Sequence, residues 1–296
     1  MPTLYTFTAN LLAETTAVFT MPKTGQTVRA IGGTKFKVGG KGVNVSVAAK
    51  ELGANTVAAI FPAGEIGARC KKYLDGKVEY ISVELPGQTR EGLVCIDEKT
   101  GKETTFLGAD IPVGEDAFEK MAQLLEDKIR PGDIFAFCGS FPGWKSRYAD
   151  RLSGICKSKN ARICVDTYGA PLEDFAKTNA DLLKINRAEF LALLKSAAIP
   201  FGGDLEDSVR KFHTPARMLA VTDGPNPAVF RDGDDIFKVS PPEIKEVSAT
   251  GCGDITLATL IVEMFLKGKS ARESFSTAVR TASAAAATRE ITTTMC

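Results

Sequence analysis

Two glycine-rich segments of the sequence place a chemically active side chain at the start of an apolar helical pattern. Residues 39–44 (GGKGVN) contain a lysine and an asparagine, and residues 249–254 (ATGCGD) end on a carboxylate. The free N–H groups in the first turn of a helix attract anions, and glycine lets the backbone approach a ligand closely. The two segments therefore predict anion-binding loops that carry a cation and a carboxylate.

The carboxylate of Asp254 has two interpretations. It can cap the following helix, because an acidic side chain there satisfies N–H groups and complements the helix dipole. Alternatively, it is a general base that takes a hydroxyl proton while the loop amides hold a transferring phosphoryl group. The residue types alone leave both interpretations open.

A lysine at a helix N-terminus faces the positive end of the helix dipole, which is locally unfavourable. Lys41 therefore indicates an anionic ligand, and Asn44 adds a neutral donor and acceptor within one turn of it. The alternative for Lys41 is a solvated side chain in a flexible turn.

The elements that must position these side chains alternate between strands and helices. Helical periodicity or weaker helical patterns cover residues 45–52, 115–128, 145–159, 188–197, 255–266 and 275–286. Apolar, β-rich runs between them predict strands at residues 4–8, 56–62, 133–138, 162–166, 181–185 and 218–221. This alternation predicts an α/β fold with a mostly parallel sheet and helices on both faces.

Two regions, roughly residues 12–38 and 86–110, break the alternation. They contain polar-alternating strand patterns without a helix between them, such as residues 90–97 and 103–107, joined by a hairpin turn at residues 98–101. We expect a small β-rich lid on a single α/β domain that spans residues 1–296.

Composition excludes several classes of function. The 296 residues carry 37 basic and 36 acidic side chains, a net charge of +1, so no basic field for nucleic acid is expected. One histidine and seven scattered cysteines make a Cys/His zinc site unexpected and suit a reducing compartment. No apolar stretch approaches the length of a membrane span. We expect a cytoplasmic protein without nucleic-acid or membrane partners.

The two glycine-rich segments together resemble the two signatures of the ribokinase/PfkB carbohydrate kinase family. Three intermediate segments agree with this family: residues 139–142 (GSFP) are similar to G-S-L-P, residues 184–189 (KINRAE) to K-P-N-x-x-E, and residues 221–224 (VTDG) to the turn before the nucleotide loop. The motifs follow the family's order and span nearly the whole chain. The resemblance implies a ribokinase-like, doubly wound sheet with a lid.

The activity that the resemblance implies is ATP-dependent phosphorylation of a sugar hydroxyl. Asp254 would deprotonate the acceptor, which favours the base over the cap. The amides of Gly251, Cys252 and Gly253 would stabilise charge on the transferring phosphoryl group.

The resemblance also implies a set of nucleotide-binding residues. Asn186 and Glu189 would organise Mg²⁺ and phosphate through waters, without a direct protein ligand to the metal. Lys184 and Thr222 would face the nucleotide phosphates, and Gly224 would permit close backbone approach. The resemblance leaves a requirement for a monovalent cation open.

Within the family, the lysine of residues 39–44 is similar to that of the phosphosugar branch, which contains 1-phosphofructokinase and tagatose-6-phosphate kinase. Arg90, in a Thr-Arg pair, resembles a lid residue of that branch, and an arginine can hold a phosphate bidentately. Arg90 can equally be an exposed strand residue. Gly39, Gly40, Lys41, Asn44 and Arg90 are thus predicted to bind fructose 1-phosphate or tagatose 6-phosphate.

Several positions depart from the family pattern. Glu14 stands where the branch has a sugar-binding aspartate, so its longer side chain alters the hydroxyl geometry while it stays a predicted substrate ligand. Cys252 replaces an alanine, Ile185 replaces a proline, and Pro227 stands near an expected glycine of the nucleotide loop.

Two other functions stay open at this stage. One is a kinase of an unphosphorylated sugar or nucleoside, such as fructose or ribose, which Lys41 and Arg90 disfavour. The other is a non-catalytic sugar- or nucleotide-binding regulator, which the retained Asp254 disfavours. The resemblance further implies a homodimer formed through the lid, whose exposed strand edges favour pairing.

Overall fold

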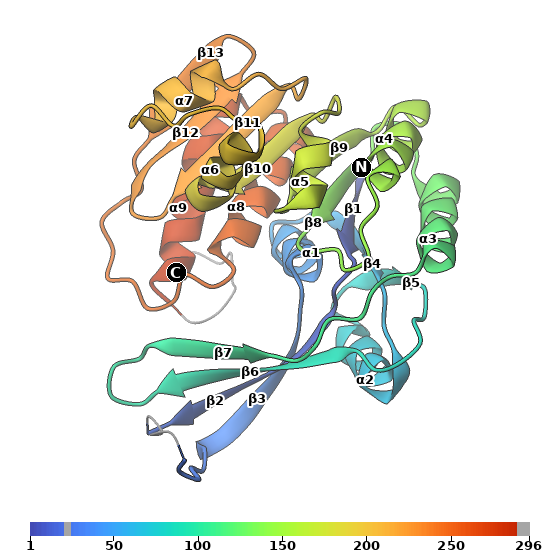
Figure 1. The fold of residues 1–296 in the computed structure, drawn as a ribbon, viewed down its shortest axis with the longest axis vertical. Helices are drawn as coiled ribbons and strands as arrows, with labels where there is room; N and C mark the ends of the chain where they lie inside the picture. Colours follow the sequence, from blue (N-terminus) through green and yellow to red (C-terminus); the bar gives the residue numbers. More distant parts are fainter. Residues whose placement is uncertain (21–24, 289–296) are drawn as a thin grey trace.

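The strands form one large sheet and one small sheet in the computed structural model, which describes residues 1–20 and 25–288 (Figure 1). The lid positions 21–24 and the predicted thiol of Cys296 lie outside these ranges. Within the described part, the large sheet has the order β13-β12-β11-β10-β9-β8-β1-β4-β5. Its strands are β1 (Thr3–Thr8), β4 (Asn55–Ile60), β5 (Glu79–Ser82), β8 (Ile134–Cys138), β9 (Arg162–Asp166), β10 (Leu182–Asn186), β11 (Met218–Asp223), β12 (Asn226–Asp232) and β13 (Asp235–Val239).

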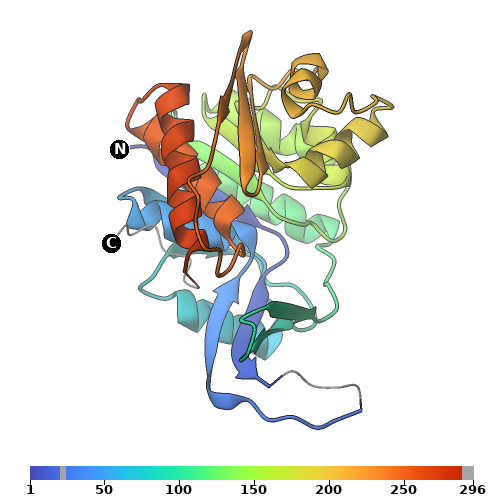
Figure 2. The same cartoon turned by 90° about the vertical axis from the view of Figure 1, so that its left-hand side faces the viewer.

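Helices cover both faces of the large sheet, as Figure 2 shows. One apolar cluster joins the sheet to α1 (Lys41–Glu51), α8 (Cys252–Leu260), its π-helical continuation η1 (Ile261–Leu266) and α9 (Ala271–Ala286). The cluster on the other face joins it to α3 (Glu115–Lys128), α4 (Arg147–Ser158), α5 (Ala170–Phe175), α6 (Arg187–Ser196) and α7 (Leu205–Lys211). The pairs from β11 to β5 are parallel, and β12 and β13 are antiparallel. The doubly wound, mostly parallel fold is therefore confirmed.

The small sheet is the predicted lid, and it projects from one end of the molecule (Figure 1). Its strands are β2 (Leu12–Phe19), β3 (Ile31–Gly39), β6 (Arg90–Asp97) and β7 (Glu103–Leu107), in the order β3-β2-β6-β7. An apolar cluster at its root packs against α2 (Gly64–Leu74). Because β2 leaves β1 almost directly and β3 leads directly into α1, the lid is anchored beside the first glycine-rich segment.

Most predicted elements are confirmed, and α3 has the predicted bounds. The helix predicted at residues 255–266 is wrong at its start, because α8 begins at Cys252 and takes Asp254 into its first turn. The sequence analysis did not predict α2, α5, α7, β5 or the β12–β13 hairpin.

The direction of strand addition reverses at β1, which lies between β8 and β4. In open α/β sheets, ligands bind outside the carboxyl ends of the strands at such a switch point. The helices α1 and α8 begin at this end. No helix in the described ranges is long and apolar enough to cross a membrane.

Candidate active site

The carboxylate of Asp254 is buried at the start of α8, with 4% of the residue exposed. Its Oδ2 accepts a hydrogen bond of 2.7 Å from Asn44 Nδ2, which joins the two predicted glycine-rich segments. The side chain makes no capping hydrogen bond, and Gly251 is the N-cap. The hydrogen-bonding part of the capping interpretation is therefore wrong, because the carboxylate accepts from Asn44 on α1, whereas its place in the first turn of α8 does complement the helix dipole.

Burial and the nearby negative charge of Asp166 raise the pKa of Asp254 to about 6, although the Asn44 hydrogen bond and two lysines lower it in part. A carboxylate with such a pKa is ionised near neutral pH and is more basic than an exposed aspartate. Asp254 is thus poised to accept a proton.

Asp166, at the carboxyl end of β9, is a buried residue of this site that the sequence analysis missed. Its Oδ1 lies 2.7 Å from Lys41 Nζ and its Oδ2 lies 2.6 Å from Lys184 Nζ. Burial alone would raise the pKa of Asp166, but the two lysines outweigh burial and lower it. Two signals were available: its position at the end of a predicted strand, and the resemblance of residues 166–170 (DTYGA) to a D-T-S-G-A segment of the tagatose-type kinases.

Lys41 is directed toward these carboxylates. Its Nζ also lies 3.4 Å from Glu189 Oε1, while burial, which lowers the pKa of Lys41, is outweighed by Asp166 and Glu189, which raise it. The structure thus brings Lys41 together with Glu189, a predicted nucleotide residue. Arg90 is not among its contacts, so the two predicted phosphate-binding cations lie in different clusters.

The loop from Gly251 to Gly253 begins α8: the amide of Cys252 donates to the carbonyl of Ala249 at 3.3 Å, and the amides of Gly251 and Gly253 are free of partners within the described ranges. Gly251 has a φ of 82°, a left-handed conformation that favours glycine. A Cβ added to Gly253 would lie 2.7 Å from Lys184 Nζ, so the buried ammonium group supports the loop directly. Burial raises the pKa of the Cys252 thiol to about 11, which makes the thiolate unavailable as a nucleophile at neutral pH.

A cavity of about 440 Å³ opens on the outer side of this loop. Thr222 and Gly224, two of the predicted nucleotide-binding residues, line it together with Cys252 and Gly253. The small side chains of Ala282 and Ala286 on α9 form part of its wall. The cavity and the free amides of α8 are suited to a planar base joined to phosphates.

Asn186 and Glu189 form a reciprocal cap at the start of α6. Asn186 Oδ1 accepts from Glu189 N at 2.9 Å, and Glu189 Oε2 accepts from Asn186 N at 2.8 Å. With Oε1 beside Lys41, both oxygens of Glu189 already have protein partners. No group of three or more His, Cys, Asp or Glu residues within the described ranges is arranged to hold a metal ion. Because both of its oxygens are engaged, Glu189 fits a metal ion held through waters better than one that it ligates directly.

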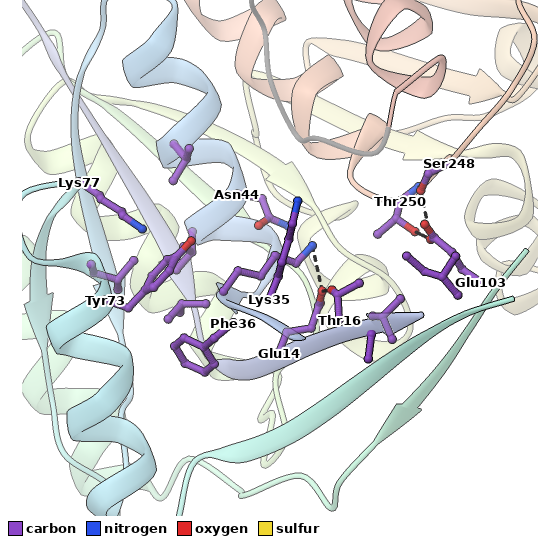
Figure 3. A pocket seen from close by; sticks show the side chains of 18 of the residues that line it. Glu14, Thr16, Lys35, Phe36, Asn44, Tyr73, Lys77, Glu103, Ser248 and Thr250 are labelled. Atoms are coloured by element: carbon purple, nitrogen blue, oxygen red, sulfur yellow. Dashed lines mark hydrogen bonds and ion pairs between the residues drawn. The ribbon is translucent and has the colours of Figure 1, made fainter. Parts of the chain in front are cut away.

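A second cavity, of about 880 Å³, separates the lid from the core (Figure 3). Glu14 and Asn44 both line it, and Glu14 Oε1 forms a 2.9 Å ion pair with Lys37 Nζ on the neighbouring strand. Glu14 is buried, with 7% exposed, so this charge lies in the cavity wall rather than in solvent. Lys35 adds a further cation to the same wall.

Arg90 lies where the lid joins the core and is not a freely exposed strand residue. Its Nη1 is 2.8 Å from Asp110 Oδ1, and its Nη2 donates to the carbonyl of Asn10 at 3.3 Å. Asn10 Nδ2 in turn donates to Asp110 Oδ1 and to Ser140 Oγ, both at 2.9 Å. Asn10 and Asp110 were not among the predicted site residues, although Asn10 opens the segment that contains Glu14.

Gly40 serves packing. Its φ is 117°, and a Cβ added there would lie 2.5 Å from Thr8 Cγ2 on β1. At Gly39 an added Cβ would meet Leu12 at 3.3 Å and Glu14 Oε2 at 3.5 Å. Both predicted substrate residues therefore shape the junction between β1, β3 and α1.

Comparison with known proteins gives a consistent assignment. The model of the family described as "pfkB family carbohydrate kinase" matches residues 11–295. The chain is 30% identical over 240 residues to ATP-dependent 6-phosphofructokinase isozyme 2 of Escherichia coli, which covers 77% of this chain and 75% of that protein. It is 26% identical to 1-phosphofructokinase of Bacillus subtilis, over 88% of this chain and 84% of that protein.

Solved structures agree with these relatives. Phosphofructokinase-2 from Escherichia coli in complex with potassium superposes with a TM-score of 0.89 at 25% identity, covering 98% of this chain and 94% of that one. A ribokinase from Thermotoga maritima superposes with a TM-score of 0.76 at 18% identity, over 98% and 95% of the two chains, which shows the shared fold.

Proposed function

Because the chain belongs to the pfkB family of carbohydrate kinases, we propose that it transfers the γ-phosphoryl group of ATP to a hydroxyl of a sugar phosphate. One observation carries the proposal: buried Asp254 is hydrogen-bonded to Asn44, which lines the lid-side cavity, and directly follows Gly253, which lines the 440 Å³ cavity. The named activities of the relatives support a phosphorylated acceptor.

In the proposed reaction, Asp254 takes the proton of the acceptor hydroxyl as its oxygen bonds to phosphorus. The bond between that phosphorus and the bridging oxygen breaks, and ADP leaves. The amides at Gly251, Cys252 and Gly253 stabilise the charge on the transferring group, and Lys184 beneath the loop adds a fixed positive charge. Because Asp166 orients both Lys41 and Lys184, we assign it a positioning role.

The nucleotide base is proposed to occupy the 440 Å³ cavity, with Thr222 and Gly224 near the phosphates. Mg²⁺, held through waters near Asn186 and Glu189, would neutralise phosphate charge. The potassium complex of the similar Escherichia coli protein extends the proposal to a monovalent cation. Comparing ADP release in potassium and in choline salts would test this extension.

The sugar phosphate is proposed to bind in the lid-side cavity, with Asn44 and Glu14 near its hydroxyls. The cluster of Arg90 and Asn10 would receive the substrate's phosphate, because the guanidinium Nε is buried and has no partner in the described ranges. Lys41 would serve the transferring phosphoryl group, since its ammonium contacts Asp166 and Glu189.

The test is magnesium-dependent ADP release with fructose 1-phosphate, fructose 6-phosphate, tagatose 6-phosphate, fructose and ribose. We expect the best sugar phosphate to exceed the free sugars at least tenfold in kcat/KM. Arg90→Ala should raise KM for that substrate without a comparable change for a free sugar. Arg210→Ala, which removes a surface arginine paired with Glu206, is the matched control. Preference for a free sugar would support the unphosphorylated alternative, and no turnover would support a regulator.

We also propose a homodimer through the lid. Ile31, Phe106 and Leu107 are 42%, 60% and 55% exposed, respectively, on the two edge strands of the small sheet. A tetrameric inhibited form is known for phosphofructokinase-2 from Escherichia coli. Sedimentation equilibrium of the wild type and Phe106→Asp tests this assembly, and a monomeric wild type would contradict it. The cytoplasmic location stays a prediction.

A further inference from the structure

At one side of the lid-side cavity, a carboxylate of the lid contacts the loop that precedes Gly251 and Gly253. Glu103, the first residue of β7, uses Oε2 to accept hydrogen bonds from Ser248 Oγ and Thr250 Oγ1, each at 3.1 Å. Thr250 N donates to Ser248 Oγ at 3.3 Å, which closes a three-residue network. Figure 3 shows Glu103 beside both residues at one side of the cavity.

The same loop is tied to the core from its other side. The amides of Val247 and Ser248 both donate to the carbonyl of Ala286 on α9, at 2.8 and 3.1 Å. Residues 247–250 are thus held between α9 and the lid. Because Thr250 directly precedes Gly251, a shift of Thr250 alters the direction of the first amides of α8.

We propose that Glu103 is a positioning residue that couples lid closure over the sugar to the geometry of the phosphoryl-binding loop. This inference rests on the proposed function. With Glu103 engaged, the lid covers the acceptor and the loop amides are held in place; with Glu103 released, both are freed together. Water then reaches the transferring phosphoryl group more readily.

The contact is strong enough for this role. Hydrogen bonds to an ionised carboxylate are stronger than neutral ones, and Glu103 accepts two of them through one oxygen. Their partial exposure limits the effect, so we expect a change of about tenfold in the equilibrium between the engaged and released lid. Most of β7 beyond Glu103 is exposed, so packing contributes little to holding this strand against the core.

The kinetic test compares Glu103→Ala, Glu103→Gln and Glu98→Ala. Glu98 is a lid carboxylate whose Oε2 accepts from Thr20 Oγ1 within the lid, so it is the matched control. The readouts are kcat, KM and the ratio of ADP to phosphorylated sugar. We expect Glu103→Ala to lower kcat about tenfold and to raise the ratio above one, because ATP is hydrolysed by water. Glu103→Gln should recover most of the loss, since its amide oxygen still accepts from both hydroxyls.

A second readout does not depend on turnover. Hydrogen exchange of the amides of residues 247–253 should be faster in Glu103→Ala than in the wild type and unchanged in Glu98→Ala. Equal exchange in all three proteins would overturn the proposed positioning role of Glu103 even where no kinase activity is found. A Glu103→Ala enzyme with wild-type kcat and an ADP-to-product ratio of one would also overturn it. If no turnover is found but exchange is faster in Glu103→Ala, the positioning role of Glu103 is supported and only the proposed function is contradicted.

Discussion

The two helices that start at the site, α1 and α8, both follow glycine-rich segments, but their glycines serve different purposes. At α1, a Cβ added to Gly42 would meet the carbonyl oxygen of Phe7 at 2.7 Å and the hydroxyl of Thr8. At α8, a Cβ added to Gly253 would meet the ammonium group of Lys184 at the same distance. The first helix is packed against the backbone of β1, and the second against the buried ammonium group of Lys184, which is ion-paired with Asp166.

This difference separates support from chemistry. The close approach of α1 to β1 fixes where Lys41 and Asn44 stand, and those side chains then reach Asp166 and Asp254. The close approach at α8 leaves free amides above a buried ammonium group. A glycine-rich helix start in the sequence therefore indicates a close contact without telling whether the contact is with protein or with ligand.

The largest expected effect is at the base that α8 carries. Asp254→Asn should lower kcat about 10³-fold, because general-base catalysis contributes on that order and an amide does not accept the proton. Steady-state ADP release with the best sugar phosphate measures this effect. An undiminished kcat would remove Asp254 from the mechanism.

A smaller loss of activity is expected at the loop. Gly253→Ala should lower kcat about 100-fold, because the new methyl group displaces Lys184 from beneath the loop amides. Because Lys184 Nζ is buried and lies 2.6 Å from Asp166 Oδ2, displacing it should also lower the free energy of unfolding. Kinetics and urea unfolding of the same preparation separate the two quantities. Loss of stability with full activity would reverse the comparison.

The matched change at α1 should act on stability without a comparable loss of kcat. Gly42→Ala forces a methyl group against the backbone of β1, where nothing moves cheaply, and overpacking of this kind costs about 1–3 kcal/mol. Urea unfolding measures the loss. The folded enzyme should keep its KM for ATP; a large rise in that KM with unchanged stability would show that α1 contacts the nucleotide through this glycine.

The last prediction concerns the free energy of unfolding and how much the burial of the Asp254 carboxylate lowers it. Burial raises the pKa of Asp254 from 3.8 to about 6, so the folded state favours the protonated carboxyl. The resulting contribution to stability is fully present below about pH 4 and is lost as the pH rises through 6. At pH 7.5, Asp254→Asn should therefore raise the free energy of unfolding by at most about 3 kcal/mol. The gain should vanish near pH 4. Thermal unfolding at both pH values decides, and a destabilised variant at pH 7.5 would contradict the assigned burial cost.

The sequence predicted the parallel core because strand and helix periodicities are local, and it predicted Asp254 and the loop amides because they form a contiguous motif. Asp166 was missed because its importance comes from two lysines, on α1 and β10, that meet it only in the folded chain. For the same reason, the sequence did not distinguish Lys41 beside Glu189 from Lys41 beside Arg90. The β12–β13 hairpin was missed because the alternation of strands and helices along the chain predicts a helix, rather than two more strands, after β11.

The pH dependence of kcat/KM for the best sugar phosphate tests the central claim, that buried Asp254 is the base, most directly. This quantity reports ionisations of the free enzyme, whose Asp254 has a pKa of about 6, and of the free sugar phosphate, whose second phosphate pKa is also about 6. The same profile is therefore measured with a free sugar as the acceptor. We expect the logarithm of kcat/KM to rise with unit slope up to about pH 6 and to level off above it. A profile that stays flat from pH 8 down to pH 5 would contradict the claim.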